Sequence, residues 1–399
     1  MDDVFSRVAN QFVFPVEALA ATPSILAGFS AAEEAAARLS STAFVDKLAH
    51  RLGRLPTETV AVAKVFLLRF GMRHVVAKDG QHIHPYVAGA ISLLVPLTAN
   101  AFIDSVLLLV VSWRQSATAL FLACKSTDHY RKLTNVIYQC RYISFKGPEG
   151  VAMEFVQIPE FKDSDREYEK WYENIITTEE LMTTALCFDF VVQLPHEVIP
   201  AILPLCFDGV RLEETEEESQ ICTQIYQKLR HHAYHYANEC MSTTLPLRYN
   251  RNLLALIILR LAVEATKKAF LKTKPSARVV EFLESMLLAP STDHTSPRTN
   301  MFYAHDLFDR IAKFRGAASY DGVLVGEGSL VGQDGDDFVK GLTGPALSKY
   351  LFDVGKEILL VSNRPKYEKY MQELLSPIIA RIQAMKKLFT CLARKARSL

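Results

Sequence analysis

The clearest candidate for chemistry in this sequence is a histidine cluster. His231, His232 and His235 form an HHxxH pattern inside a stretch with helical periodicity. Residues at i and i+4 share a helix face, so His231 and His235 could together bind a metal ion. No acidic or thiol ligand follows at a usual spacing apart from Cys240, and a polar helix face accounts for the pattern better. We therefore expect no metal site.

Two further motifs are weaker still. His82 and His84 form an isolated HxH pair, and the glycines of 326–332 follow a GxGxxxG spacing without the strand-then-helix frame of a phosphate-binding loop. The chain has no GxxxxGK[ST], HEXXH or GxSxG motif and no kinase catalytic motif. The sequence shows no recognisable combination of a nucleophile, a general base and an oxyanion donor. We expect a protein without catalytic residues or a cofactor, and not an enzyme.

Composition narrows the class of protein. The chain has 399 residues, of which 49% are hydrophobic and 22% charged, as in globular proteins. Lys and Arg number 45 against 44 Asp and Glu, a balance that makes direct nucleic-acid binding doubtful. Seven cysteines without a CxxC pair argue against a disulfide scaffold or a zinc ribbon and indicate a reducing compartment. No secretory signal is expected at the start of the sequence.

The elements that would position any site are predicted to be mostly helices. Ser30 and Glu33 have the spacing of a capping box, and apolar residues behind them repeat at helical spacing. The first half is predicted to be a compact bundle of about five helices, and two long helices follow in the second half. The predicted helices cover 30–48, 56–70, 117–124, a segment around 133–137, a segment opening at 178, 221–237 and 252–269. The acidic run 213–218 is interpreted as a solvated helix start.

One segment does not fit this soluble pattern. Residues 87–113 are almost wholly apolar, with Asp104 the only charge, and are long enough to span a bilayer. Pro96 and Asn100 inside the segment weaken that interpretation.

Several motifs recur in an order and spacing that resemble a known family. They are Gln11-Phe12-Val13-Phe14, Thr22-Pro23-Ser24, Arg69-Phe70, the stretch 117–125, Arg131-Lys132-Leu133, Phe188-Asp189, Asn238-Glu239-Cys240 and Thr243-Thr244-Leu245. Together they are similar to the transcription-type cyclins, the group of cyclins C, H, K, L and T, and most similar to the K and T group. The match covers roughly residues 11–268.

The resemblance implies an all-α fold of tandem five-helix cyclin boxes with a C-terminal helical extension. We expect an N-terminal box over 11–190, with an atypical apolar insert at about 74–112, and a second box over 191–289. A loop or linker would cover 290–337. The extension would cover 338–399 and end in a basic tail, which could be a nuclear address or a phosphate contact but is more typical of a helix C-terminus.

The same resemblance implies a regulatory subunit that binds and activates a cyclin-dependent kinase, as a heterodimer in the nucleus, without a membrane. The kinase would phosphorylate the C-terminal repeat of RNA polymerase II. Residues that match kinase-binding positions of the family are Lys125, Glu179, Leu122, Phe188 and Phe190. The alternatives are a TFIIB-like cyclin-fold transcription factor and a non-activating scaffold.

The chain departs from the family pattern at two places. Ser126-Thr127-Asp128 replaces the acidic pair that follows the lysine. The larger departure is the insert at 74–112, because the family crosses this point with a short loop. We interpret the insert first as a translated intron or gene-model error, second as a genuine extra helix beside the box, and third as a membrane span.

Overall fold

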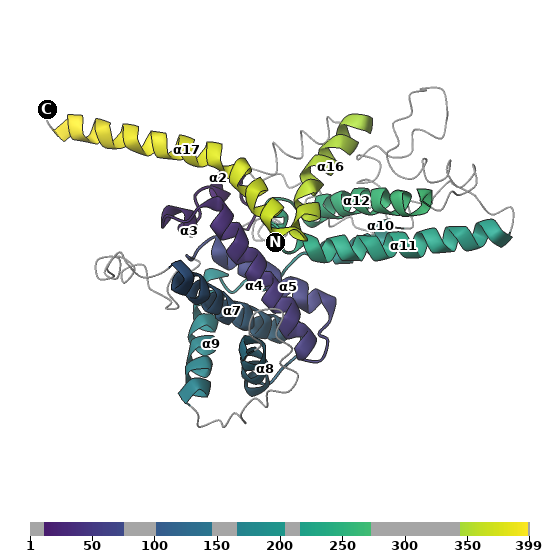
Figure 1. Cartoon of the computed structure of the whole chain (residues 1–399), viewed down its shortest axis with the longest axis horizontal. Coiled ribbons are helices and arrows are strands. Elements are labelled where there is room, and N and C mark those ends of the chain that lie inside the picture. Colours follow the sequence, from purple (N-terminus) through teal and green to yellow (C-terminus); the bar gives the residue numbers. More distant parts are fainter. Residues whose placement is uncertain (1–11, 76–100, 146–165, 204–215, 273–343, 398–399) are drawn as a thin grey trace, which may run out of the picture. The chain divides into compact units, whose positions relative to one another are not determined.

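The described part of the chain is entirely helical. A computed structural model of the chain describes residues 12–75, 101–145, 166–203, 216–272 and 344–397, and these ranges contain helices and no strand (Figure 1). The all-α prediction is confirmed for these residues. The long helices are α4 (Ala31–Arg51), α5 (Thr57–Gly71), α7 (Ala101–Ser126), α8 (Leu133–Phe145), α9 (Arg166–Ala185), α11 (Glu216–Cys240), α12 (Arg251–Leu271), α16 (Gly344–Val361) and α17 (Arg364–Arg397). The short helices are α2 (Val16–Leu19), α3 (Pro23–Leu26), η1 (Pro195–Glu197), α10 (Ile199–Ile202) and η3 (Leu245–Leu247).

The chain divides into two compact units. The first unit contains Val16–Val192 together with Asn363–Leu399, and the second contains Gln193–Ser362 together with the residues before Val16. The predicted extension over 338–399 is therefore divided, because α16 packs in the second unit and α17 in the first. The predicted linker over 290–337 lies outside the described residues.

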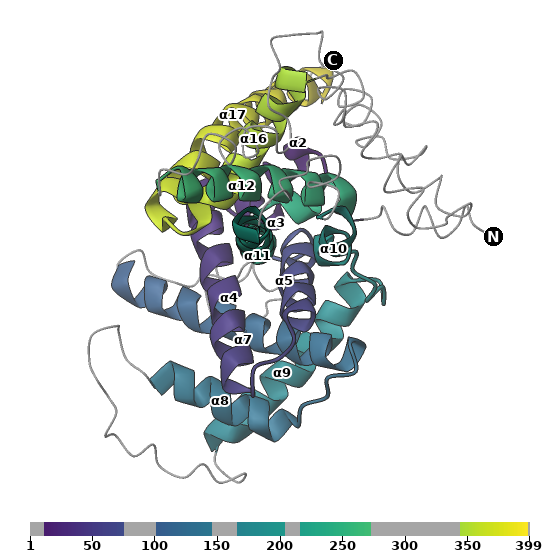
Figure 2. The ribbon, with the colours of Figure 1, turned by 90° about the vertical axis from the view of Figure 1, so that its right-hand side faces the viewer.

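In the first unit, α7 is the central helix. It contacts α4, α5, α8 and α9, which surround it (Figures 1 and 2). Its residues from Ala117 to Cys124 are all buried, and all of them except Thr118 are apolar, so this part of the helix is apolar on nearly every side. A helix that is apolar all round must be covered on all sides, and its four neighbours do this.

The local signals that start the first two helices of this bundle are as predicted. Ser30 Oγ accepts a hydrogen bond from the Glu33 amide at 3.2 Å, and Glu33 Oε2 accepts from the Ser30 amide at 2.8 Å, which completes a capping box at the start of α4. α4 ends before Gly53, whose φ of +95° is readily adopted only by glycine. α5 begins directly after Pro56, as the sequence indicated.

The predicted bounds of the third helix are wrong at the N-terminal end. We expected a helix over 117–124, whereas α7 begins at Ala101. Residues 101–112, which we assigned to the apolar insert, therefore continue the third helix instead of forming a separate element. The rest of the insert, 76–100, lies outside the described residues, so its origin stays a prediction. Among the described residues, no helix is both long and apolar enough to span a membrane.

The predicted start of the fifth helix is also wrong. Thr178-Glu179-Glu180 resembled a first helical turn, but α9 begins at Arg166. The physical reason is an apolar stripe before Thr178, because Tyr168, Trp171 and Ile175 are buried at helical spacing. Glu179 consequently lies in the second half of a long helix.

The second unit is built around α12, which packs against α11 and α16. The turn after α11 carries the Thr243-Thr244-Leu245 motif, and a fully buried carboxylate of α16 binds it. Glu357 Oε1 accepts from the Thr244 amide at 2.6 Å and from Thr244 Oγ1 at 2.8 Å. α16 also approaches α12 closely at Gly355, where a Cβ atom would lie 3.0 Å from Leu261 Cδ1. α16 is thus an integral part of this unit.

Candidate functional site

The two charged residues singled out in the sequence lie together on the surface of the first unit. Lys125, in the last turn of α7, donates from Nζ to Glu179 Oε1 of α9 at 2.6 Å. The lysine side chain is 42% exposed and the glutamate side chain 16% exposed. Lys125 Nζ also lies 4.2 Å from the centroid of the Phe121 ring. An ion pair with this exposure retains donors and acceptors for a partner molecule.

The chain after α9 makes a strained turn that displays an aromatic ring. The Phe188 amide donates to the Thr183 carbonyl at 3.1 Å and the Cys187 amide to the Thr184 carbonyl at 2.9 Å, the pattern of a Schellman motif. Cys187 and Phe188 both have left-handed backbone conformations, with φ of +54° and +58°. Such residues cost free energy and are concentrated at functional sites. The turn leaves Phe188 71% exposed.

Helix α5 holds the turn segment, which we define as residues 187–191, in place. Arg69 Nη1 donates to the Val191 carbonyl at 3.4 Å, and Arg73 Nη1 lies 3.1 Å from Cys187 Sγ. The Phe190 ring packs edge-to-face on Phe66, with 6.0 Å between centroids. Burial lowers the pKa of the Arg69 guanidinium to about 10, and the nearby charge of Asp189 opposes this shift.

The five predicted binding residues therefore differ in their accessibility. Lys125 and Phe188 are exposed, and Glu179 and Phe190 are half-buried. Leu122 is only 5% exposed and belongs to the core around α7. As the chain stands alone, four of these residues reach the surface, whereas Leu122 supports it from beneath.

The sequence analysis missed several exposed apolar residues of the same region. Tyr172 and Ile176 precede Glu179 by seven and three positions, so they share its face of α9, and they are 46% and 41% exposed. Val191, at the end of the turn segment, is 74% exposed. The sequence does contain a signal for them, because Tyr172 and Ile176 are spaced as on one helix face before Glu179. This signal went unused because the fifth helix was predicted to begin only at Thr178.

The turn after α7 is also anchored to α5. Thr59, near the start of α5, lies within hydrogen-bond distance of Thr127 Oγ1, at 2.9 Å, and of His129 Nδ1, at 3.1 Å. Asp128 between them has a left-handed φ of +58°. Arg131 Nε donates to the Leu52 carbonyl at the end of α4. The segment that replaces the family's acidic pair is therefore held firmly beside Lys125.

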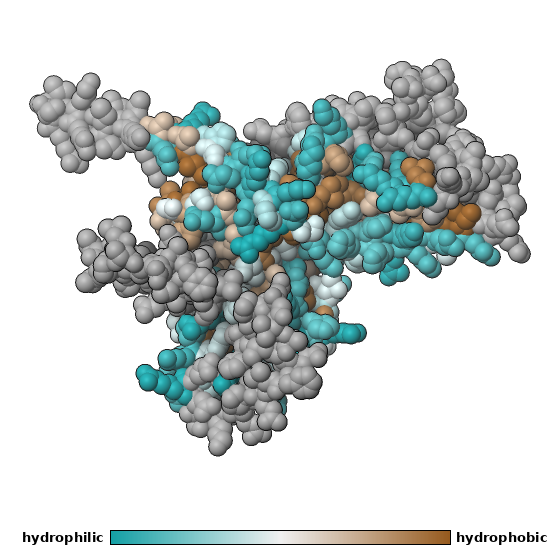
Figure 3. All heavy atoms as spheres, in the orientation of Figure 1, coloured by the Kyte–Doolittle hydropathy of each residue, from teal (hydrophilic) through white to brown (hydrophobic). Residues whose placement is uncertain are grey.

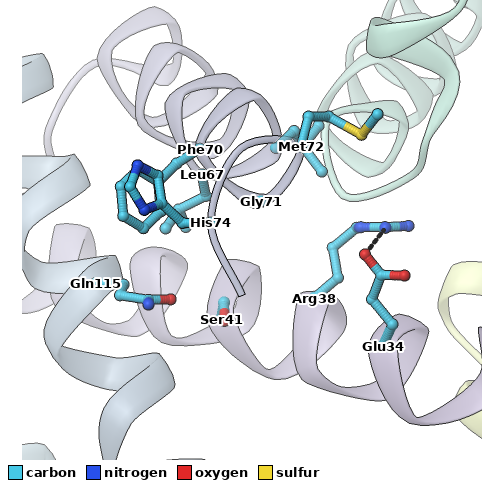
Figure 4. A pocket seen from close by; sticks show the side chains of 10 residues that line it. Glu34, Arg38, Ser41, Leu67, Phe70, Gly71, Met72, His74 and Gln115 are labelled. Atoms are coloured by element: carbon cyan, nitrogen blue, oxygen red, sulfur yellow. Dashed lines mark hydrogen bonds and ion pairs between the residues drawn. The ribbon is translucent and has the colours of Figure 1, made fainter. Parts of the chain in front are cut away.

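A small pocket lies on another side of α7, between α4 and α5 (Figure 4). Its volume of about 30 Å³ is that of roughly one water molecule, far too small for an organic cofactor. Glu34 at its edge accepts from Thr22 Oγ1 at 3.0 Å and lies 3.4 Å from Arg38 Nη2. Burial raises the pKa of Glu34, and Arg38 opposes this. Gln115 Nε2, also buried there, has no hydrogen-bond partner among the residues that the structure describes.

The histidine motif of the second unit forms an aromatic helix face. The His231 and His232 rings lie 5.8 Å apart between centroids, and His232 stacks on Tyr236 at 6.3 Å. Within the described residues no group of three His, Cys, Asp or Glu side chains could hold a metal ion. Hydrophilic residues cover the exposed side of α11 in Figure 3. The HxH pair at 82–84 and the glycine motif at 326–332 lie outside the described residues.

Comparison with known proteins shows similarity to a curated cyclin. Cyclin pch1 of Schizosaccharomyces pombe is 26% identical over 194 residues, which cover 49% of this chain and 45% of that protein. This chain thus matches less than half the length of its relative. No protein-family model matches the chain.

A solved structure shows a weaker likeness. A chain of the crystal structure of the yeast RNA Pol II CTD kinase CTDK-1 complex is 14% identical, with a TM-score of 0.36 over 70% of this chain and 76% of that one. The similarity to a curated cyclin over about half of this chain agrees with the resemblance of its motifs to the transcription-type cyclins, without separating the K, T, L and C groups.

Proposed function

We propose that the chain is the regulatory subunit of a transcription-related cyclin-dependent kinase, acting in the nucleus, and not itself an enzyme. The observation that carries this proposal is the ion pair of the exposed Lys125 with Glu179, in the same unit as the exposed apolar side chains of Ile176, Phe188 and Val191. We call these residues the Lys125 surface: Lys125, Glu179, Ile176, Phe188 and Val191. A central apolar contact with charge-assisted hydrogen bonds is typical of hot spots in protein interfaces.

The chemistry of this surface suits a helix of a kinase. Phe188 and Val191 offer apolar area whose burial favours association. Lys125 keeps unused donors, and Glu179 keeps unused acceptor positions, that can bind backbone groups of the partner. If the chain binds only the state in which the kinase has its regulatory helix turned in, binding shifts the kinase towards its active state. The repeat tail of RNA polymerase II is the substrate that we expect for that kinase.

A charge exchange tests this proposal. Lys125→Glu combined with Glu179→Lys keeps an ion pair within the chain but presents the opposite charges to a partner. The matched control is the same exchange of Arg364 and Glu368, an exposed pair at 2.7 Å on α17 of the same unit. Each tagged full-length variant would be expressed in the organism's own cells and purified by its tag, and co-purified kinases would be identified by mass spectrometry.

We expect the wild type and the control to capture one protein kinase that phosphorylates a polymerase-tail peptide. We expect the Lys125 and Glu179 exchange to capture at least about 30-fold less, the loss of a hot-spot contact of about 2 kcal/mol. Equal capture by all three proteins would mean that the pair acts only within the chain. Capture of no kinase by the wild type would refute the regulatory role and favour a scaffold or a promoter-binding factor.

A further inference from the structure

The last helix carries an apolar stripe with coiled-coil spacing. From residue 371 to residue 392 of α17, apolar residues are alternately four and three positions apart. This spacing defines the a and d positions of three heptads. The a positions hold Leu375, Ile382 and Phe389, and the d positions hold Met371, Ile378, Met385 and Leu392. We call this set the α17 stripe.

The first part of the α17 stripe already packs against a helix. Met371 and Leu375 are at most 2% exposed, and α17 contacts α4 in the first unit. Gln372 Oε1 accepts a hydrogen bond from the Ala32 amide in the first turn of α4. This face of α17 is therefore a helix-packing surface, not a solvated one.

The described residues of the second part of the α17 stripe are less covered. Burial decreases after Leu375, since Ile378 and Ile382 are half-exposed and Met385 is 49% exposed. In Figure 1 the C-terminal half of α17 projects past α2 and α4 of its own unit. The stripe continues for about 26 Å from Leu375 to Leu392 at the rise of an α-helix.

The charges around this free half all have one sign. Residues 376–399 contain six Lys and Arg residues and no Asp or Glu. In the heptad register Arg381 and Lys395 take g positions and Lys386 takes an e position, the positions that flank an apolar seam. Lys387 takes an f position, on the opposite side of the helix.

We propose that the C-terminal half of α17 binds an acidic amphipathic helix of a partner protein, which extends the helix packing begun by α4. The partner would place apolar residues against the α17 stripe and carboxylates opposite Arg381, Lys386 and Lys395. This interaction goes beyond the proposed kinase binding and uses none of the residues of the Lys125 surface.

Two other occupants fit the observations less well. A second copy of α17 would bring like charges to both sides of the seam, in either orientation, because the segment contains no acidic residue. A bilayer surface does not require the four-and-three spacing of apolar residues, whereas the start of the same stripe, at Met371 and Leu375, already packs against a helix. A helix with acidic flanks satisfies both the spacing and the charge.

A synthetic peptide provides the probe. It has four heptads with Leu at a and d and Glu at e and g, so that its own pairing is opposed by like charge. Binding of the fluorescein-labelled peptide to the full chain would be followed by fluorescence anisotropy. We expect micromolar affinity that weakens with rising salt, and at least tenfold weaker binding by the double variant Ile382→Ser with Met385→Ser. A scrambled peptide of equal charge should not bind.

Neighbouring lysines give a matched pair of variants. Lys386→Glu reverses a charge beside the seam, and Lys387→Glu reverses a charge opposite it, with the same change in net charge. We expect Lys386→Glu to weaken peptide binding about fivefold and Lys387→Glu less than twofold, since each pairing of surface charges contributes up to about 1 kcal/mol. Circular dichroism would establish that both variants keep the helical content of the wild type.

Several results would overturn the proposal. Equal weakening by both lysine variants, or equal binding of the scrambled peptide, would indicate attraction by net charge alone. Dimerisation in sedimentation experiments that Ile382→Ser abolishes would identify a second copy as the occupant. Binding to phosphatidylserine vesicles without peptide binding would identify a membrane surface. Kinase capture by the Ile382→Ser, Met385→Ser variant should remain as in the wild type, so this test and that of the kinase proposal can fail independently.

Discussion

Replacing Arg69 by methionine should change the stability of the first unit only slightly, but it should loosen the turn segment that displays Phe188. Arg69 is 9% exposed on α5, and its guanidinium holds the turn segment through the Val191 carbonyl. Arg69 is not one of the residues of the Lys125 surface, but it binds the backbone of one of them, Val191. The substitution therefore tests whether the exposed aromatic is positioned from below.

The size of the effect follows from two opposing contributions. Burial lowers the pKa of the Arg69 guanidinium to about 10, even with Asp189 nearby, which corresponds to about 3 kcal/mol against the charged form. At pH 7 the group is still charged, so the folded chain carries this cost. The hydrogen bond to Val191 contributes about 1.5–3 kcal/mol in the opposite direction. We expect Arg69→Met to change the free energy of unfolding by less than about 1.5 kcal/mol, because methionine fills most of the space without the charge.

The local effect should be larger than the global one. Without the guanidinium, the Phe190 contact with Phe66 and the Arg73 contact with Cys187 still hold the turn segment to α5, but the hydrogen bond to the Val191 carbonyl is lost. Hydrogen exchange of the amides of 187–191, measured by mass spectrometry, should become at least tenfold faster. Kinase capture should fall, because Phe188 is then no longer held in one conformation.

A second buried cation on α5 provides the control. Lys64 is 4% exposed and pairs at 2.9 Å with Asp46, which lies on α4 and not in the turn segment. Lys64→Met should leave hydrogen exchange at 187–191 unchanged. If Arg69→Met lowered the free energy of unfolding by more than 3 kcal/mol, or left exchange at 187–191 as in the wild type, the positioning argument would be refuted.

Three other substitutions have outcomes that follow from single observations. Cys187→Gly should raise the free energy of unfolding, measured by chemical denaturation, by about 1 kcal/mol, because glycine adopts a φ of +54° without strain. A decrease would mean that the loss of the contact between Arg73 and the Cys187 sulfur outweighs the relief of backbone strain. Gly355→Ala should lower it by about 1–3 kcal/mol, since the new methyl group would lie 3.0 Å from Leu261 Cδ1; an unchanged melting temperature would contradict the close packing of α16. Burial raises the pKa of Glu34, so the folded chain binds a proton at this carboxylate more tightly than the unfolded chain does. The wild type should therefore gain stability relative to Glu34→Gln as pH falls from 7 towards 4.5. A gain in its relative stability as pH rises would contradict the direction of this pKa shift.

Local signals predicted the parts of the fold that depend on neighbouring residues. The capping box at Ser30 and the start of α5 after Pro56 require only a few adjacent side chains. The start of α9 was mistaken because Glu179 and Glu180 resemble a first turn, while the stabilising contacts of Trp171 and Ile175 depend on burial against other helices. The packing of α17 on α4 joins residues 340 positions apart at Ala32 and Gln372, and no local pattern reports such a contact.

In the candidate site, too, some features could be predicted from the sequence and others depend on contacts between distant residues. Lys125 and Glu179 were selected by resemblance to a family, and the structure places them 2.6 Å apart. The support of the turn segment by Arg69 could not be predicted, since the sequence shows an arginine in an apolar helix but not the carbonyl that it binds 122 residues away. Leu122 was selected from its matching position, whereas its exposure depends on how tightly α7 is enclosed.

The geometry of the Lys125 surface depends on helix α5, although α5 contributes no residue to that surface. α7 and α9 carry the ion pair, and each is followed by a left-handed turn, at Asp128 and at Cys187 and Phe188. Both turns are fastened to α5, the first through Thr59 near its start and the second through Arg69 near its end. Left-handed conformations of such residues persist only where surrounding contacts determine them. Because α5 supplies contacts to both turns, a change in α5 would move both ends of the surface together, and the residues that determine partner binding extend beyond those that a partner touches.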